Sequence, residues 1–161
     1  MAIAVAKPLM TYTVGDLMSP QVVMIPVEMS IQGAARLLSR SQVSGAPVVD
    51  AEGRCVGVVS ATDFVHWAEG NGRRASPDRT EECMCSAWQI LEEKDFPETC
   101  VRTLMTKDPV TATPATKIGV VAQMMLDAHI HRAIVVDERR RPIGVVSSTD
   151  ILAAVARADH N

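Results

Sequence analysis

The sequence predicts an α+β protein made of two copies of one strand–helix–strand–strand–helix unit, packed sheet to sheet about a pseudo-twofold axis. The main observation is a duplication, because "GVVSATD" at 57–63 returns as "GVVSSTD" at 144–150, an offset of 144 − 57 = 87. The match continues without a gap from Leu17 to Val65, and "VVD" at 48–50 returns at 135–137. An ungapped repeat over about fifty residues indicates two structural units of the same kind.

Each copy predicts its elements in the same order. Prolines in "PQVVMIP" (20–26) and "DPVTATP" (108–114) exclude a helix interior and favour an extended piece. A helix follows at Ser30 and at Lys117, because apolar residues recur on one helical face: Ile31, Ala34, Ala35 and Leu38, then Ile118, Val121, Ala122 and Met125. Two strands, "APVVD" with "CVGVVS" and "AIVVD" with "PIGVVS", are joined by polar turns, and a second helix begins near Asp63 or Asp150.

The predicted domain boundaries are 9–66 for the first repeat, 67–99 for an insert and 100–158 for the second repeat. One unit alone would bury only about 60% of its surface, so the two must share a core. The charged, Gly- and Pro-containing stretch at 68–82 predicts a loop. Cys83 and Cys85 could bind a metal with His66 or Cys100, but their C-x-C spacing is not that of zinc sites. We therefore expect no metal and reduced thiols.

Composition and motifs exclude several function classes. The net charge is −3 and aromatic residues are 3%, which argues against nucleic-acid binding. Lys7 and Pro8 interrupt the apolar N-terminus well short of a membrane span, and no basic residue precedes it as in a signal peptide, so we expect a cytoplasmic protein. The chain contains no G-x-S-x-G, H-E-x-x-H or P-loop motif, and we expect no catalytic residues and no enzyme activity.

The repeated motif carries groups suited to a nucleotide. Gly57 and Gly144 have no side chain and would let a ligand approach the backbone closely. In each copy a serine at the strand–helix junction suits a phosphate, a threonine adds a hydroxyl, and an ionised aspartate can accept both hydrogens of a ribose diol. These residues are Ser60, Thr62 and Asp63, then Ser147, Thr149 and Asp150. The alternative is a capping box, in which the same serine and aspartate only begin a helix.

The order "LMSPQVVMIP…VSGAPVVDAEGRCVGVVSATDF", repeated as "LMTKDPVTATP…IHRAIVVDERRRPIGVVSSTDI", closely resembles a tandem pair of cystathionine beta-synthase (CBS) domains, the Bateman module. The resemblance covers nearly the whole chain except the insert and a short N-terminus. It implies adenine-nucleotide or related adenosyl ligands in clefts between the repeats, and dimerisation. It also implies that adenine lies along the first strand of each copy, at Val23, Met24 and Ile25, and at Val110, Thr111 and Ala112.

The copies differ where Ser44 and Gly45 are replaced by His131 and Arg132. An arginine fork can hold two phosphate oxygens and a neighbouring histidine can add a donor. The pair resembles the His-Arg of the gamma subunit of AMP-activated protein kinase, although Ala133-Ile134 stands where that family has Leu-Pro. We therefore expect phosphate binding that differs between the two clefts. The alternative is a solvated pair at a strand edge.

Together these features predict a stand-alone regulatory module. We expect it to bind AMP, ADP or ATP as a regulatory ligand rather than a cofactor, to form a homodimer and to signal to a separate partner. One alternative is a ligand-free dimerisation or scaffold protein. Others are a sensor of S-adenosylmethionine or NAD(H), and a metal or redox sensor built on Cys83, Cys85 and Cys100.

Overall fold

The computed structural model describes residues 8–72 and 99–158 of the chain. Its helices are η1 (Leu9–Thr11), α1 (Val14–Leu17), α2 (Ile31–Arg40), α3 (Ala61–Gly72), η2 (Val101–Thr103), α5 (Ile118–Asp127) and α6 (Ser148–Ala158). Its strands are β1 (Ile25–Pro26), β2 (Gly45–Val49), β3 (Cys55–Ser60), β4 (Thr106–Lys107), β5 (Thr111–Ala112), β6 (Arg132–Val136) and β7 (Pro142–Ser147). Cys83, Cys85 and most of the predicted insert lie outside the described residues.

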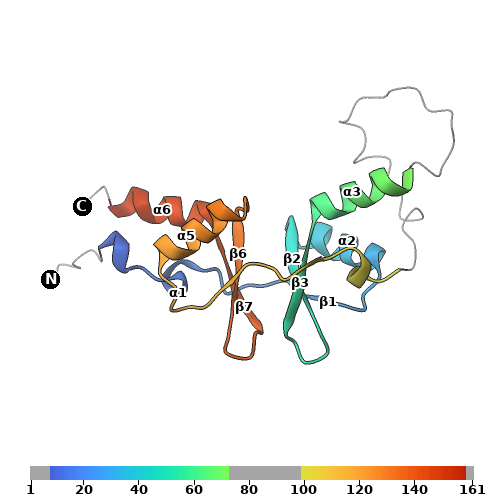
Figure 1. Cartoon of the computed structure of the whole chain (residues 1–161), viewed down its shortest axis with the longest axis horizontal. Coiled ribbons are helices and arrows are strands. Elements are labelled where there is room, and N and C mark those ends of the chain that lie inside the picture. The colour runs from blue at the N-terminus through green and yellow to red at the C-terminus, as the bar shows by residue number, and fades with distance from the viewer. Residues whose placement is uncertain (1–7, 73–98, 159–161) are drawn as a thin grey trace, which may run out of the picture.

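The two repeats form two sheets of matching design. One has the order β1-β2-β3-β4 and the other β5-β6-β7. In each, the short first strand runs parallel to the second strand, which forms an antiparallel hairpin with the third. The sheets lie at the centre of the molecule, with α2 and α3 towards one end of its long axis and α5 and α6 towards the other (Figure 1). The predicted α+β fold class is confirmed.

The helices begin where the apolar pattern predicted. Ser30 is the N-cap of α2 and its Oγ accepts a hydrogen bond from the Gly33 amide at 3.1 Å, while Lys117 holds the same place before α5. The α3 helix continues to Gly72, beyond the predicted boundary at 66, and Trp67 packs against the core of the first repeat. No helix within the described ranges is long and apolar enough to cross a membrane.

The segments that precede the first strand of each repeat pack on the other repeat. We call residues 12–19 and 99–107 the lead-in segments. The second one supplies β4, which pairs with β3 of the first repeat, and buries Val101 in the first core. The first one buries Val14 in the second core, and Ser19 exchanges two backbone hydrogen bonds with Val145 of β7, at 2.9 and 3.0 Å. The hydrophobic core of each repeat is therefore completed by the lead-in segment of the other repeat.

This exchange explains the two glycines of the repeated motif. A Cβ atom on Gly57 would lie 2.6 Å from Met105 Sδ and 2.9 Å from the carbonyl oxygen of Thr106. On Gly144 it would lie 2.6 Å from Met18 Sδ. The close approach to the backbone that we expected at these glycines is made by the lead-in segments.

The two sheets contact each other through a small apolar cluster. Cys55, Ile134 and Val136 are buried together, and the Cys55 amide donates a hydrogen bond to the Arg140 carbonyl at 2.8 Å. The symmetry-related bond cannot form because Pro142, at the position equivalent to Cys55, has no N–H. Burial between the sheets raises the pKa of the Cys55 thiol.

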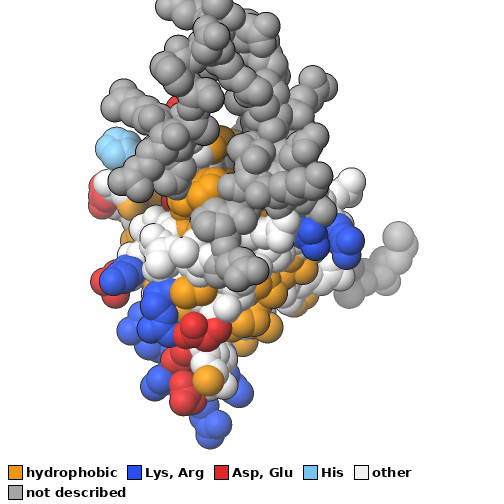
Figure 2. Space-filling model, turned by 90° about the vertical axis from the view of Figure 1, so that its right-hand side faces the viewer, with side chains coloured by type: hydrophobic (Ala, Val, Ile, Leu, Met, Phe, Trp, Pro, Cys, Tyr) orange, Lys and Arg blue, Asp and Glu red, His pale blue; other side chains and the backbone are white. Residues whose placement is uncertain are grey.

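Both hairpin turns are organised by an aspartate. Asp137 Oδ1 accepts hydrogen bonds from the Arg139 and Arg141 amides, each at 2.9 Å, and Oδ2 accepts one from Arg141 Nε at 2.8 Å. Asp50 makes the equivalent bonds in the first hairpin. The backbone and side-chain hydrogen bonds from Arg141 lower the pKa of Asp137. Acidic and basic side chains gather together at this end of the molecule, so it carries no field of a single sign (Figure 2).

Candidate functional site

A cleft of about 800 Å³ lies between the two repeats and receives side chains from both. The first repeat contributes the start of β2, the end of β3 and the start of α3. The second contributes the residues after β4, the residues before β6 and the start of α6. Among the predicted site residues, those lining the cleft are Ser60, Thr62, Asp63, Val110, His131, Arg132, Ser147 and Thr149. A volume of this size is typical of small-molecule sites.

Other predicted site residues lie elsewhere: Val23, Met24, Ile25, Thr111, Ala112 and Asp150 do not line this cleft. Ile25 is fully buried in the first core and Ala112 is buried in the second, because strand alternation turns them towards the helices. Val23 packs against the first core, whereas Met24 is exposed. Of the residues proposed to flank adenine, only Val110 lines the cleft.

Both aspartates of the motif cap their helices. Asp63 Oδ2 accepts hydrogen bonds from the amide and hydroxyl of Ser60, at 2.6 and 2.8 Å. Asp150 Oδ2 accepts the same bonds from Ser147, at 2.8 and 2.6 Å, and the Asp150 amide donates to Ser147 Oγ at 3.2 Å. The predicted pairing of serine and aspartate at the start of each helix is therefore present. Both bonds to Asp63 end on Oδ2, however, so Oδ1 keeps its lone pairs for a further donor.

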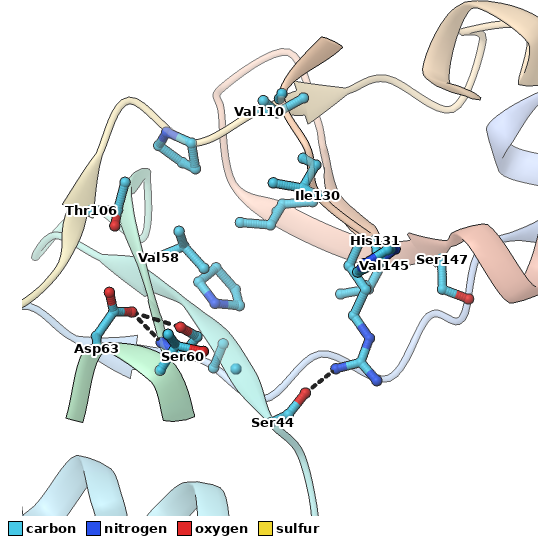
Figure 3. Close-up of a pocket in the computed structure, with 18 of the residues that line it drawn as sticks. Ser44, Val58, Ser60, Asp63, Thr106, Val110, Ile130, His131, Val145 and Ser147 are labelled. Atoms are coloured by element: carbon cyan, nitrogen blue, oxygen red, sulfur yellow. Dashed lines mark hydrogen bonds between the residues drawn. The ribbon is translucent and has the colours of Figure 1, made fainter. Parts of the chain in front are cut away.

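The cleft is polar at two sides and apolar between them. Asp63 lies at one side, and His131 and Ser147 lie at the other (Figure 3). Val58 and Ile130 come from different repeats and lie between these polar groups. A carboxylate at one side, a histidine and an arginine at the other, and an apolar lining between them suit a ligand that carries a diol, an anionic group and a flat apolar ring.

Arg132 is tied to the opposite repeat. Its Nη1 donates a hydrogen bond to Ser44 Oγ, which precedes β2 of the first repeat, and both side chains are exposed to the cleft (Figure 3). Ser44 itself is anchored, because its carbonyl accepts a hydrogen bond from the Ala61 amide at the start of α3, at 2.8 Å. The predicted arginine therefore lies at the boundary between the repeats and is not a free side chain at a strand edge.

Sequence reasoning missed other lining residues, among them the polar side chains of Ser44, Thr106 and Asp108. Ser44 could have been found, because it occupies the position that His131 holds in the second copy. Thr106 and Asp108 belong to the second repeat yet line the same cleft as Asp63, and no local pattern indicates that arrangement. Asp108 has a φ of 52°, the left-handed conformation that aspartate tolerates better than most residues.

Within residues 8–72 and 99–158, no group of three or more His, Cys, Asp or Glu side chains is placed to hold a metal ion. Cys55 and Cys100 are both free thiols. The proposed C-x-C pair, Cys83 and Cys85, lies outside these ranges.

Comparison with known proteins identifies related sequences. The sequence profile described as the CBS domain matches the chain twice, over residues 14–70 and 101–157. The chain is 33% identical over 130 residues to the uncharacterized protein MJ1426 of Methanocaldococcus jannaschii, covering 74% of this chain and 77% of that protein. It is 29% identical over 150 residues to the CBS domain-containing protein CBSX2, chloroplastic, of Arabidopsis thaliana, covering 89% of this chain but only 63% of that protein.

Solved structures share the fold. A crystal structure of CBSX2 in complex with AMP matches with a TM-score of 0.69 and 25% identity, covering 92% of this chain and 98% of that one. The CBS domain pair of protein MJ0100, in complex with 5′-methylthioadenosine and S-adenosyl-L-methionine, matches with a TM-score of 0.69 and 23% identity, covering 91% of this chain and 98% of that one. The second likeness concerns the fold alone.

Proposed function

Because the chain belongs to the CBS-domain family and carries the domain twice, we propose that it is a regulatory module that binds an adenine nucleotide in the cleft between its repeats. The observation that carries the proposal is the placement of Asp63 from one repeat and Arg132 from the other around one cavity of about 800 Å³. The AMP complex of CBSX2 supports the ligand class, since that protein shares the fold at 25% identity.

Each part of the nucleotide has a candidate partner. Asp63 Oδ1 would accept from the ribose diol while Oδ2 continues to cap α3. Val58, Val110 and Ile130 would enclose the adenine. Arg132 would pair with the phosphate, with the neighbouring His131 adding a donor.

We expect AMP to bind more tightly than ATP. A single guanidinium can pair with one phosphate group through two parallel hydrogen bonds. The cleft also presents the carboxylates of Asp63 and Asp108, which repel additional negative charge. The charge of the lining thus favours a ligand with one phosphate group.

Titration calorimetry with AMP, ATP, adenosine, NADH and S-adenosylmethionine tests the proposal. We expect heat with AMP, and weaker binding of ATP and adenosine. Asp63→Ala should weaken AMP about 10- to 100-fold, the range for a lost hydrogen bond to a charged group. Asp150→Ala is the matched control for the helix cap, because Asp150 makes the same capping bonds but does not line this cleft. Absence of heat and of thermal shift with every ligand would exclude the proposal.

The capping bonds favour a second candidate, a ligand-free dimerisation or scaffold protein. If Asp63 and Asp150 act only as caps, each alanine variant should cost about 1 kcal/mol of unfolding free energy and change nothing else. The two candidates are separated by whether Asp63→Ala and Asp150→Ala differ in ligand binding, since their effects on stability should be alike.

The homodimer, the separate partner and the cytoplasmic location belong to the same proposal. Four large hydrophobic side chains, Val120, Leu126, Leu152 and Val155, are exposed on α5 and α6. Their equivalents 87 residues earlier are Gly33, Ser39, Val65 and Ala68, so the first repeat has no such set. We propose that two copies associate through α5 and α6. Analytical sedimentation would test this by comparing the oligomeric state of the wild type with that of Leu152→Glu.

The free thiols of Cys55 and Cys100 are in keeping with a reducing compartment.

A further inference from the structure

The hydrogen bond between Arg132 and Ser44 joins the two repeats beside the cleft. Near the hairpin turns, the two repeats meet through the hydrogen bond from the Cys55 amide to the Arg140 carbonyl. Along the sheets, they meet through the buried cluster of Cys55, Ile134 and Val136. Arg132 and Ser44 lie at the opposite strand ends, since β6 begins at Arg132 and β2 begins one residue after Ser44. The Arg132 side chain of the second repeat is thus held by Ser44 of the first repeat.

We infer that Ser44 is a positioning residue, which orients Arg132 for phosphate recognition. This inference rests on the nucleotide site proposed above. A guanidinium carries five N–H donors in a planar fork. The bond to Ser44 uses one of them and leaves the others for a phosphate, so the two interactions do not compete. An exposed arginine would otherwise have to lose its rotamer freedom when the ligand binds. Ser44 removes part of that cost in advance.

The anchor is itself held in place. The Ser44 carbonyl accepts from the Ala61 amide, so Ser44 is fixed to the start of α3, two residues before Asp63. The group expected to bind the ribose and the group that orients the phosphate-binding arginine are therefore built on one rigid corner of the first repeat. Arg132 reaches that corner only when the second repeat is correctly placed. Phosphate recognition becomes a joint property of both repeats.

The duplication makes the arrangement one-sided. The position equivalent to Arg132 in the first repeat is Gly45, which has no side chain, and the position equivalent to Ser44 is His131. The reciprocal bond cannot form. Ser44 is thus predicted to act on one arginine, and through it on one phosphate.

A double-mutant cycle tests this inference with AMP and adenosine as probes in the full-length chain. Ser44→Ala should weaken AMP binding about three- to tenfold, the range for the cost of immobilising one long side chain on binding, and leave adenosine binding unchanged. Arg132→Ala should bring the affinity for AMP close to that for adenosine, because His131 is then the remaining proposed phosphate donor. In that background Ser44→Ala should have no further effect, because its only route to the phosphate is gone. Ser44→Thr, which keeps the hydroxyl, should restore AMP affinity to within about twofold.

A matched control is Ser39→Ala, since Ser39 is exposed near the end of α2 and does not line the cleft. The inference is overturned if Ser44→Ala leaves AMP binding unchanged, or weakens AMP equally with and without Arg132, which would make Ser44 a direct phosphate ligand. Equal loss of AMP and adenosine would also overturn it and indicate a structural role. If the wild type binds neither compound, the proposed function itself fails.

Discussion

Replacing Gly57 by alanine should separate the two repeats locally and lower stability. The new Cβ would lie 2.6 Å from Met105 Sδ and 2.9 Å from the Thr106 carbonyl oxygen. The methionine side chain can move away, but the carbonyl belongs to β4, whose residues pair with β3 at this point. Relief of the contact therefore requires β4 to move away from the sheet.

Over-packing of this kind costs about 1–3 kcal/mol. We expect about 2 kcal/mol for Gly57→Ala, which corresponds to a fall of about 4–8 °C in Tm for a chain of this size. Urea denaturation followed by circular dichroism measures the free energy of unfolding. Because Thr106 lines the cleft, AMP affinity should fall as well. Gly144→Ala should be destabilising to a similar degree, since its Cβ would lie 2.6 Å from Met18 Sδ and 3.1 Å from the Ser19 carbonyl oxygen.

The matched control is Gly119→Ala, at an exposed position of α5. That change should raise stability by about 0.5–1 kcal/mol, because alanine loses less backbone entropy than glycine in a helix. If the unfolding free energy of Gly57→Ala stays within about 0.5 kcal/mol of the wild-type value, the lead-in segment does not depend on close contact with β3 and the reasoning is wrong.

Three other measurements test separate features. His129 lies two residues beyond the end of α5 and has a φ of 53°, so His129→Gly should raise the unfolding free energy by about 1 kcal/mol; a decrease would contradict a left-handed conformation at this position. The pKa of Asp137 is lower in the folded chain, so its carboxylate stabilises above its unfolded-state value of about 3.9 and this contribution is lost as pH falls through the folded pKa. Asp137→Asn should therefore destabilise at neutral pH, with the difference from wild type vanishing in acid. Buried Cys55, with its raised pKa, should be alkylated more slowly than Cys100 in the native protein, and equal rates by mass spectrometry would refute its burial.

The elements of each repeat could be predicted because their signals are local. The apolar faces of α2 and α5 are complete within ten residues each, and Ser30 marks the start of one of them. The two hairpins follow from two apolar strands around a polar turn, and Asp50 and Asp137 organise those turns through neighbours at most four residues away. The choice of Asp63 and Arg132 as candidate site residues came from residue chemistry, from the difference between the copies and from the resemblance to CBS-domain pairs.

The full composition of the cleft could not be predicted, because part of it depends on which repeat each lead-in segment joins. The sequence carries "LM" at 17–18 and again at 104–105, and either pair fits either core by hydrophobicity alone. In the structure Leu17 and Met18 pack on the second core, and Leu104 and Met105 pack on the first. This exchange brings Thr106 and Asp108 into the same cleft as Asp63.

By itself, the sequence determined the duplication and the order of the elements, and it supplied the chemical groups from which the nucleotide site is proposed. Periodicity and capping act over a few residues, so they can be read along the chain. Only the tertiary structure decided that Ile25 and Ala112 face the cores, that Asp63 and Arg132 line one cleft, and that Ser44 holds the arginine. Those outcomes depend on pairings between residues as many as 88 positions apart, for which neither periodicity nor spacing carries a signal.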